Sequence, residues 1–91
     1  NSDPEVRFWL VVALVNIQIV EPGAVDVLID ATHHSHSIVR QKACAVLGTV
    51  PLADSRQADV ATALTDALND ESELVRHAAQ AALKVVAPVA K

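Results

Sequence analysis

Hydrophobic residues recur with helical spacing in three separate stretches of this 91-residue chain. In each stretch, successive apolar residues are four, three, one and three positions apart, which places them on one face of a helix. These apolar columns are Val6, Leu10, Ala13, Leu14 and Ile17; then Val39, Ala43, Val46, Leu47 and Val50; and then Val75, Ala79, Ala82, Leu83 and Val86. The pattern predicts three long helices, each with one buried face.

Two polar breaks, at residues 33–35 and 69–71, separate the second and third of these helices from shorter helices that precede them. Both breaks are rich in residues that favour a turn and a helix N-cap. Pro22 suits a first helical turn, and Pro51 follows a helix end. We therefore expect helices at residues 4–19, 23–32, 36–50, 56–69 and 72–86.

An arginine pattern repeats in phase with the helices. Arg40 follows Arg7 by 33 residues and Arg76 follows Arg40 by 36 residues, each directly after a valine. A period of about 20–50 residues is typical of a solenoid, whose repeats bury their apolar faces against each other. The sequence thus predicts an all-α solenoid of about two and a half helical hairpins in one domain, residues 1–91. Repeat one supplies only its second helix, 4–19, and is followed by repeat two, 23–50, and repeat three, 56–86, so we expect a fragment of a longer array.

The third repeat resembles the HEAT-like repeat family, particularly the short bacterial type also seen in phycobilisome-lyase-like proteins. The resemblance covers almost the entire chain and is clearest in Glu71–Leu83, where an acidic break precedes Leu-Val-Arg and an alanine-rich helix; residues 3–7 open in the same way. It implies a right-handed superhelical scaffold that binds proteins and only seldom acts as an enzyme. Histidines stand in the middle repeat at positions where Asp and Glu are usual in the family.

Charge and composition narrow the possible partners. Seven basic and eleven acidic residues give a net charge of −4, and the basic residues are scattered, so we expect no nucleic-acid partner. The apolar run from Phe8 to Val20 contains Asn16 and Gln18 and is shorter than the roughly 20 residues of a membrane-spanning helix, so we expect no membrane contact. A single cysteine, Cys44, allows no disulfide within the chain. We expect a cytoplasmic protein.

The arginine column has a structural and a functional interpretation. Arg7, Arg40 and Arg76 are expected to bind acceptors in the adjacent repeat, because a guanidinium holds two acceptors at once. Asp30 and Asp66 are the candidate partners for these inter-repeat contacts. The alternative is a ladder that binds anions.

Three histidines, His33, His34 and His36, fall in one predicted turn. Imidazoles so close together suit Zn²⁺ or Ni²⁺, yet a structural zinc site needs four ligands. We therefore expect solvated polar side chains, with a pH-sensitive surface as an alternative, and neither a metal nor a cofactor. His77 and Glu73 form an i, i+4 pair without a nucleophile, so we expect no enzyme activity.

The first predicted helix is apolar on every side, so it must be buried against something. The candidates are a missing neighbouring helix, a second copy of the chain, or a different protein. We predict a non-catalytic protein-interaction scaffold, with an accessory subunit of a lyase-type enzyme that handles a pigment or ligand as the alternative. The expected contact residues are Phe8, Trp9, Val12, Gln41, Ala45, His77 and Lys84.

Overall fold

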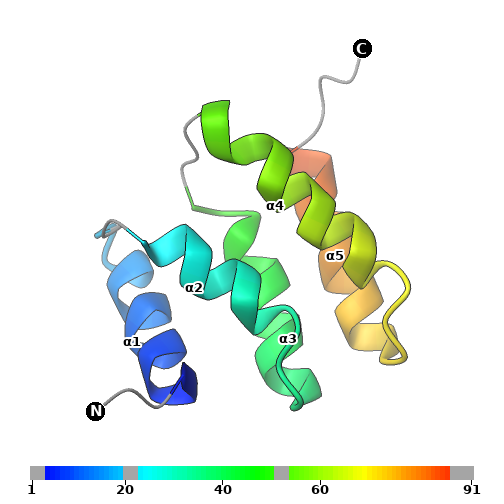
Figure 1. Ribbon diagram of the computed structural model, residues 1–91, viewed down its shortest axis with the longest axis horizontal. Coiled ribbons are helices and arrows are strands. Elements are labelled where there is room, and N and C mark those ends of the chain that lie inside the picture. The colour runs from blue at the N-terminus through cyan, green and yellow to red at the C-terminus, as the bar shows by residue number, and fades with distance from the viewer. Residues whose placement is uncertain (1–3, 20–22, 51–53, 87–91) are drawn as a thin grey trace.

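The protein, seen here in a computed structural model, is described over residues 4–19, 23–50 and 54–86 (Figure 1). Within these ranges it is built of helices and contains no strand, which confirms the all-α prediction. The helices are α1 (Pro4–Asn16), α2 (Ala24–Ala31), α3 (Ser37–Leu47), α4 (Asp54–Ala67) and α5 (Glu73–Val86). None of them is long and apolar enough to cross a bilayer.

The helix ends differ from the expected ones by up to three residues, since apolar spacing does not say where a helix stops. α1 ends at Asn16, three residues early, because Gln18 adopts a left-handed conformation with φ of 67°. The Ile19 N–H then donates to the Leu14 carbonyl at 2.8 Å and closes the helix end. α4 begins at Asp54, two residues earlier than expected.

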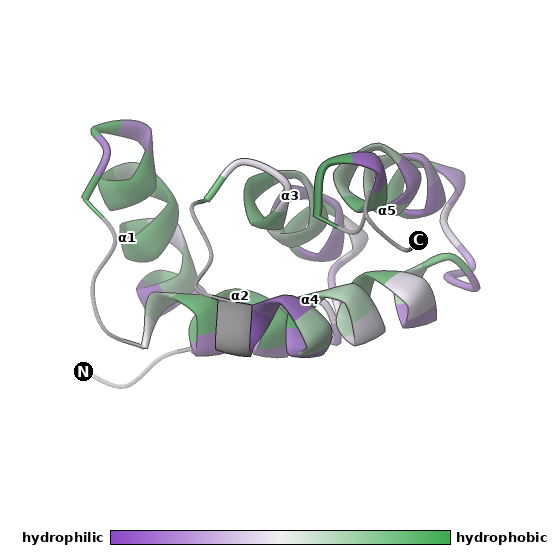
Figure 2. Ribbon diagram, turned by 90° about the horizontal axis from the view of Figure 1, so that it is seen from above, coloured by the Kyte–Doolittle hydropathy of each residue, from purple (hydrophilic) through white to green (hydrophobic). Residues whose placement is uncertain are grey.

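The helices form two layers (Figure 2). One layer holds α2 and α4, and the other holds α1, α3 and α5. α2 packs against α3 and α4 against α5, while α3 and α5 pack directly on each other. This stack of helical hairpins is the predicted solenoid.

Gly48, at the end of α3, allows α3 and α5 to approach closely. A Cβ atom at this position would lie only 2.9 Å from both the Cα and the Cβ of Ala82. Contacts of that length are not tolerated, so the packing of the two hairpins requires a glycine here.

The predicted apolar columns of α3 and α5 are confirmed as core. Every member of the α3 column is buried. In α5 every member of the column is buried except Leu83, which is half-buried. The completely buried Leu28 and Leu64 come from α2 and α4, which cover these columns. Each hairpin therefore covers the apolar face of its own second helix.

The predicted core column of α1 is wrong. Val6, Leu10 and Ile17 are 51%, 60% and 65% exposed. α1 packs instead through its other face, with Phe8 and Val12 buried, mainly on α2. The reason is that, among the described helices, none covers α1 in the way that α2 covers α3.

Candidate interaction surface

Three exposed apolar residues, Val6 and Leu10 on α1 and Ile17 in the turn directly after it, form what we call the α1 stripe. Their intervals of four and seven positions place them on one side of the helix and its end. The corresponding residues of α3 and α5 are buried, since α2 and α4 pack on those helices. The α1 stripe is thus a helix-packing face that no described helix covers, and contiguous exposed apolar surface of this kind marks an interaction site.

Two residues of the predicted contact set must be withdrawn from it. Phe8 is 1% and Val12 is 4% exposed, so both belong to the core. Sequence alignment of the repeats pointed to them because the matching positions in α3 and α5 are polar or small. They are apolar because α1 packs on α2 through that face, and the true exposed stripe lies on another side of the helix.

The other predicted contact residues reach the surface to different degrees. Trp9 is 39% exposed and packs its ring edge-on against Phe8, with the centroids 4.8 Å apart. Gln41 is half-buried and Ala45 exposed on α3, while His77 and Lys84 are exposed on α5. Trp9 directly precedes Leu10 of the α1 stripe on α1, whereas the other four lie on α3 and α5, and the role of all five in binding stays a prediction.

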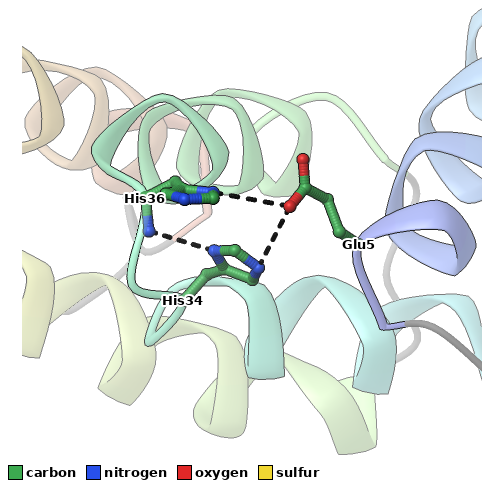
Figure 3. A group of neighbouring side chains, drawn as sticks. All are labelled: Glu5, His34 and His36. Atoms are coloured by element: carbon green, nitrogen blue, oxygen red, sulfur yellow. Dashed lines mark hydrogen bonds and ion pairs between the residues drawn. The ribbon is translucent and has the colours of Figure 1, made fainter.

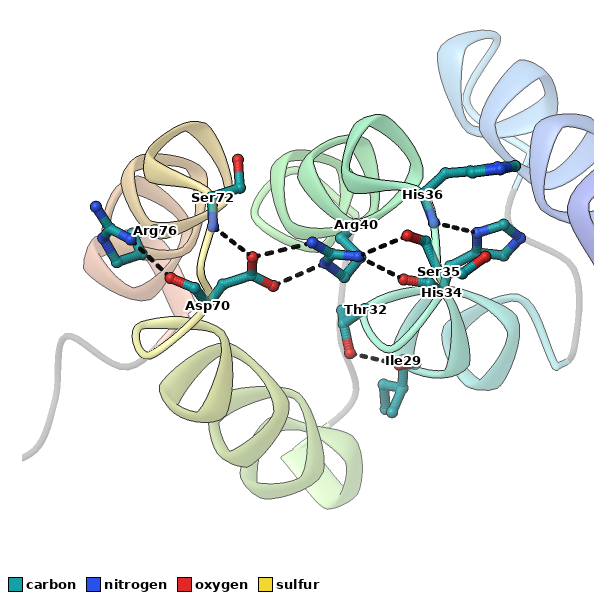
Figure 4. Close-up of polar contacts among 9 residues, drawn as sticks. All are labelled: Ile29, Thr32, His34, Ser35, His36, Arg40, Asp70, Ser72 and Arg76. Carbon is teal, nitrogen blue, oxygen red and sulfur yellow. Dashed lines mark hydrogen bonds and ion pairs between the residues drawn. The ribbon is translucent and has the colours of Figure 1, made fainter.

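Arg40 joins the second hairpin to the third (Figure 4). Its Nε donates to Oδ2 of Asp70 at 2.8 Å, and its Nη2 donates to Oδ1 at 3.1 Å. The same guanidinium reaches the carbonyls of His34 at 2.8 Å and Ser35 at 3.1 Å. Both ion-pair partners are about nine-tenths buried, and the hydrogen bond from Arg40 holds the pKa of Asp70 below its usual value.

The aspartates expected to pair with the arginine column do not do so. Asp30 and Asp66 are both exposed, and within the described part of the chain neither forms an ion pair. Arg40 uses Asp70, which lies in the loop before α5, because the carboxylate of that loop faces α3. Arg76 donates to the Asp70 carbonyl at 2.7 Å, whereas Arg7 is exposed and contributes to the wall of a hollow between α1 and α2.

His34 occupies the place in the second hairpin that Asp70 occupies in the third. Oδ1 of Asp70 accepts the N–H of Ser72, two residues later, at 2.8 Å. Nδ1 of His34 accepts the N–H of His36, again two residues later, at 3.0 Å. The two side chains thus close the same kind of turn (Figure 4).

Closing this turn directs the other edge of the His34 ring towards α1 (Figure 3). Its Nε2 lies 3.6 Å from Oε1 of Glu5, and Nδ1 of His36 lies 3.4 Å from the same oxygen. His33 does not join this group and instead lines a hollow beside Arg56. Glu5 is not among the residues predicted from sequence, although the repeat register places the loop of one hairpin beside the second helix of the repeat before it.

Cys44 is completely buried in α3. Burial, with a smaller contribution from nearby Asp70, raises the pKa of its thiol to about 11. The thiolate that a nucleophile or metal ligand requires is therefore suppressed. Cys44 is a small hydrophobic core residue.

Residues 1–84 match a family model described as HEAT repeats. No curated protein and no solved structure matches the chain. The family description does not mention a lyase, so the similarity to phycobilisome-lyase-like proteins stays a prediction. HEAT repeats typically mediate protein–protein interactions and are typically non-catalytic. From the match across nearly the whole sequence, together with the stacked hairpins, we conclude that the chain belongs to the HEAT repeat family.

Proposed function

We propose that this protein is a non-catalytic interaction module that binds an amphipathic helix of a partner along the α1 stripe. The proposal rests on one observation, the exposure of Val6, Leu10 and Ile17 at positions whose counterparts in α3 and α5 are covered by α2 and α4. The occupant we propose is a helix like the first helix of a HEAT hairpin, because such helices cover the two equivalent faces.

The covering helices indicate the chemistry of this partner. α2 buries Ala24, Leu28 and Ala31, and α4 buries Val60, Ala63, Leu64 and Ala67. Small and branched aliphatic residues at intervals of three and four positions therefore fit this type of face. Val6 and Ile17 are 11 residues apart, which corresponds to about 16 Å along a helix, so the partner helix needs about three turns.

The absence of catalysis is part of the proposal. It is supported by the burial of the Cys44 thiol and by its raised pKa. A solenoid of stacked hairpins offers an extended surface for binding another protein.

A peptide titration tests the proposal. A synthetic peptide of residues 54–69 supplies a helix with the required apolar pattern, and Trp9 on α1 is the only tryptophan that can report binding by its fluorescence. We expect a saturable change of Trp9 emission. The change should be lost in Leu10→Glu and retained in Leu74→Glu, since both leucines are 60% exposed but only Leu10 belongs to the α1 stripe.

Two results would overturn the proposal. One is an emission that does not respond to the peptide, and the other is an equal loss of response in both leucine variants. Light-scattering mass over a tenfold concentration range tests the occupant separately. We expect a monomer, whereas a dimer that Leu10→Glu dissociates would make a second copy of the chain the occupant in place of a partner helix.

A further inference from the structure

We propose that Glu5, His34 and His36 bind a divalent transition-metal ion, with Zn²⁺ as the reference case, and that the ion links α1 to the loop between α2 and α3. The site is independent of the α1 stripe. It differs from the cluster considered from sequence, since His33 is excluded and a carboxylate from another helix takes its place (Figure 3).

The distances between the candidate ligand atoms fit such an ion. Tetrahedral coordination with bonds of 2.0–2.1 Å sets neighbouring ligand atoms about 3.4 Å apart. Oε1 of Glu5 lies 3.4 Å from Nδ1 of His36 and 3.6 Å from Nε2 of His34. The one ligand atom that each residue offers lies within 4.8 Å of the other two, so small side-chain adjustments bring all three to the separations of a tetrahedral site.

The loop that holds the two histidines is fixed from several sides. Arg40 donates to the carbonyls of His34 and Ser35, and is itself held by Asp70. The Thr32 hydroxyl donates to the Ile29 carbonyl at 2.6 Å at the end of α2. Two of the three ligands are thus presented on a backbone that does not need to fold around the ion, which lowers the cost of binding.

Binding has one cost, which provides a spectroscopic signature. A metal on Nε2 of His34 leaves the ring proton on Nδ1, where the His36 N–H now donates. That hydrogen bond must open, and water can replace the lost acceptor because the bond lies at the exposed surface. The backbone amide of His36 should therefore respond to the ion more than its neighbours do.

The donor set determines which metals fit. Two imidazole nitrogens and one carboxylate oxygen suit Zn²⁺, Co²⁺, Ni²⁺ and Cu²⁺, whereas Mg²⁺ and Ca²⁺ prefer sites made of oxygen alone. Three protein ligands leave a fourth position for water or for a side chain of a partner.

The test is calorimetric titration of the untagged chain with Zn²⁺, beside spectra of the protein labelled with ¹⁵N. We expect one ion per chain, reversal by EDTA, and a selective shift of the His36 amide. His34→Asn removes the imidazole but keeps an oxygen that can accept the His36 N–H, as Asp70 does in the third hairpin. His34→Asn and Glu5→Gln should each weaken binding by roughly tenfold or more.

His33→Ala and His77→Ala are the matched controls, since both remove an exposed histidine outside the cluster. They should bind as the unchanged chain does. Equal weakening by His33→Ala and His34→Asn would show adventitious binding to surface histidines and overturn the site. Unchanged binding by Glu5→Gln would also overturn it, because α1 would then take no part.

Discussion

Val6 and Val39 occupy the same place in their repeats, directly before Arg7 and Arg40, yet they differ in burial. Val39 is 2% exposed and Val6 is 51% exposed. Replacing each by alanine removes the same two methyl groups from the same register of a helix. The comparison therefore isolates the effect of the cover that α2 gives to α3.

The expected costs follow from burial. In Val39→Ala, two methyl groups at about 0.8 kcal/mol each, together with a cavity term, amount to about 2–3 kcal/mol of unfolding free energy. In Val6→Ala, the half-exposed side chain leaves no closed cavity, and the better helix propensity of alanine offsets part of the loss. The net change should stay below about 0.5 kcal/mol.

The assay is urea unfolding of both variants in EDTA, followed by far-ultraviolet circular dichroism and by Trp9 fluorescence. Val39→Ala should lower the transition midpoint clearly, and Val6→Ala should leave it nearly unchanged with the same slope. Equal losses in the two variants would refute the reasoning, because they would mean that the face of α1 is covered in solution as that of α3 is.

Three further predictions concern the packing between hairpins. Gly48→Ala should destabilise by about 1–3 kcal/mol in thermal or urea unfolding, although alanine favours helices, because its Cβ would meet Ala82 at 2.9 Å. Asp70→Asn should cost about 2 kcal/mol at neutral pH through loss of the charged hydrogen bonds with Arg40. The pKa of Asp70 in the folded protein lies below its unfolded value of about 3.9. The stabilisation from this carboxylate is therefore present above about pH 3.9 and is lost as the pH falls through the folded pKa. Asp70→Asn should accordingly lose less stability on acidification than the unchanged chain. Cys44 should resist a thiol reagent in the folded protein and react only as fast as the chain unfolds, and rapid labelling under native conditions would contradict its burial.

The helical hairpins could be predicted from sequence because each contains the information for its own core. The columns that include Leu47 in α3 and Val75 in α5 are covered by helices only a short way before them in the chain. The same pattern failed in α1, where Leu10 has the spacing of a core residue and 60% exposure. Periodicity identifies a face that can be covered, whereas exposure depends on whether a covering helix is present.

The polar contacts between repeats could not be predicted with the same success. Asp30, Asp66 and Asp70 are all acidic residues at or near the end of a first helix, and spacing alone did not separate the loop residue from the two on helices. Only the turn at Asp70 aims a carboxylate at Arg40. The proximity of Glu5 to His34 depends equally on how consecutive repeats stack, which a single helix pattern does not specify.

The exchange of Asp70 for His34 at equivalent turns separates the shape of the backbone from the charge at its edge. Each side chain accepts the N–H two residues later, so both turns are closed in the same way. The polar atoms left over differ, since Oδ2 of Asp70 accepts from Arg40 whereas Nε2 of His34 faces Glu5. A designer of repeat arrays can therefore rewrite the affinity of one edge for cations or anions, turn by turn, without redesigning a helix.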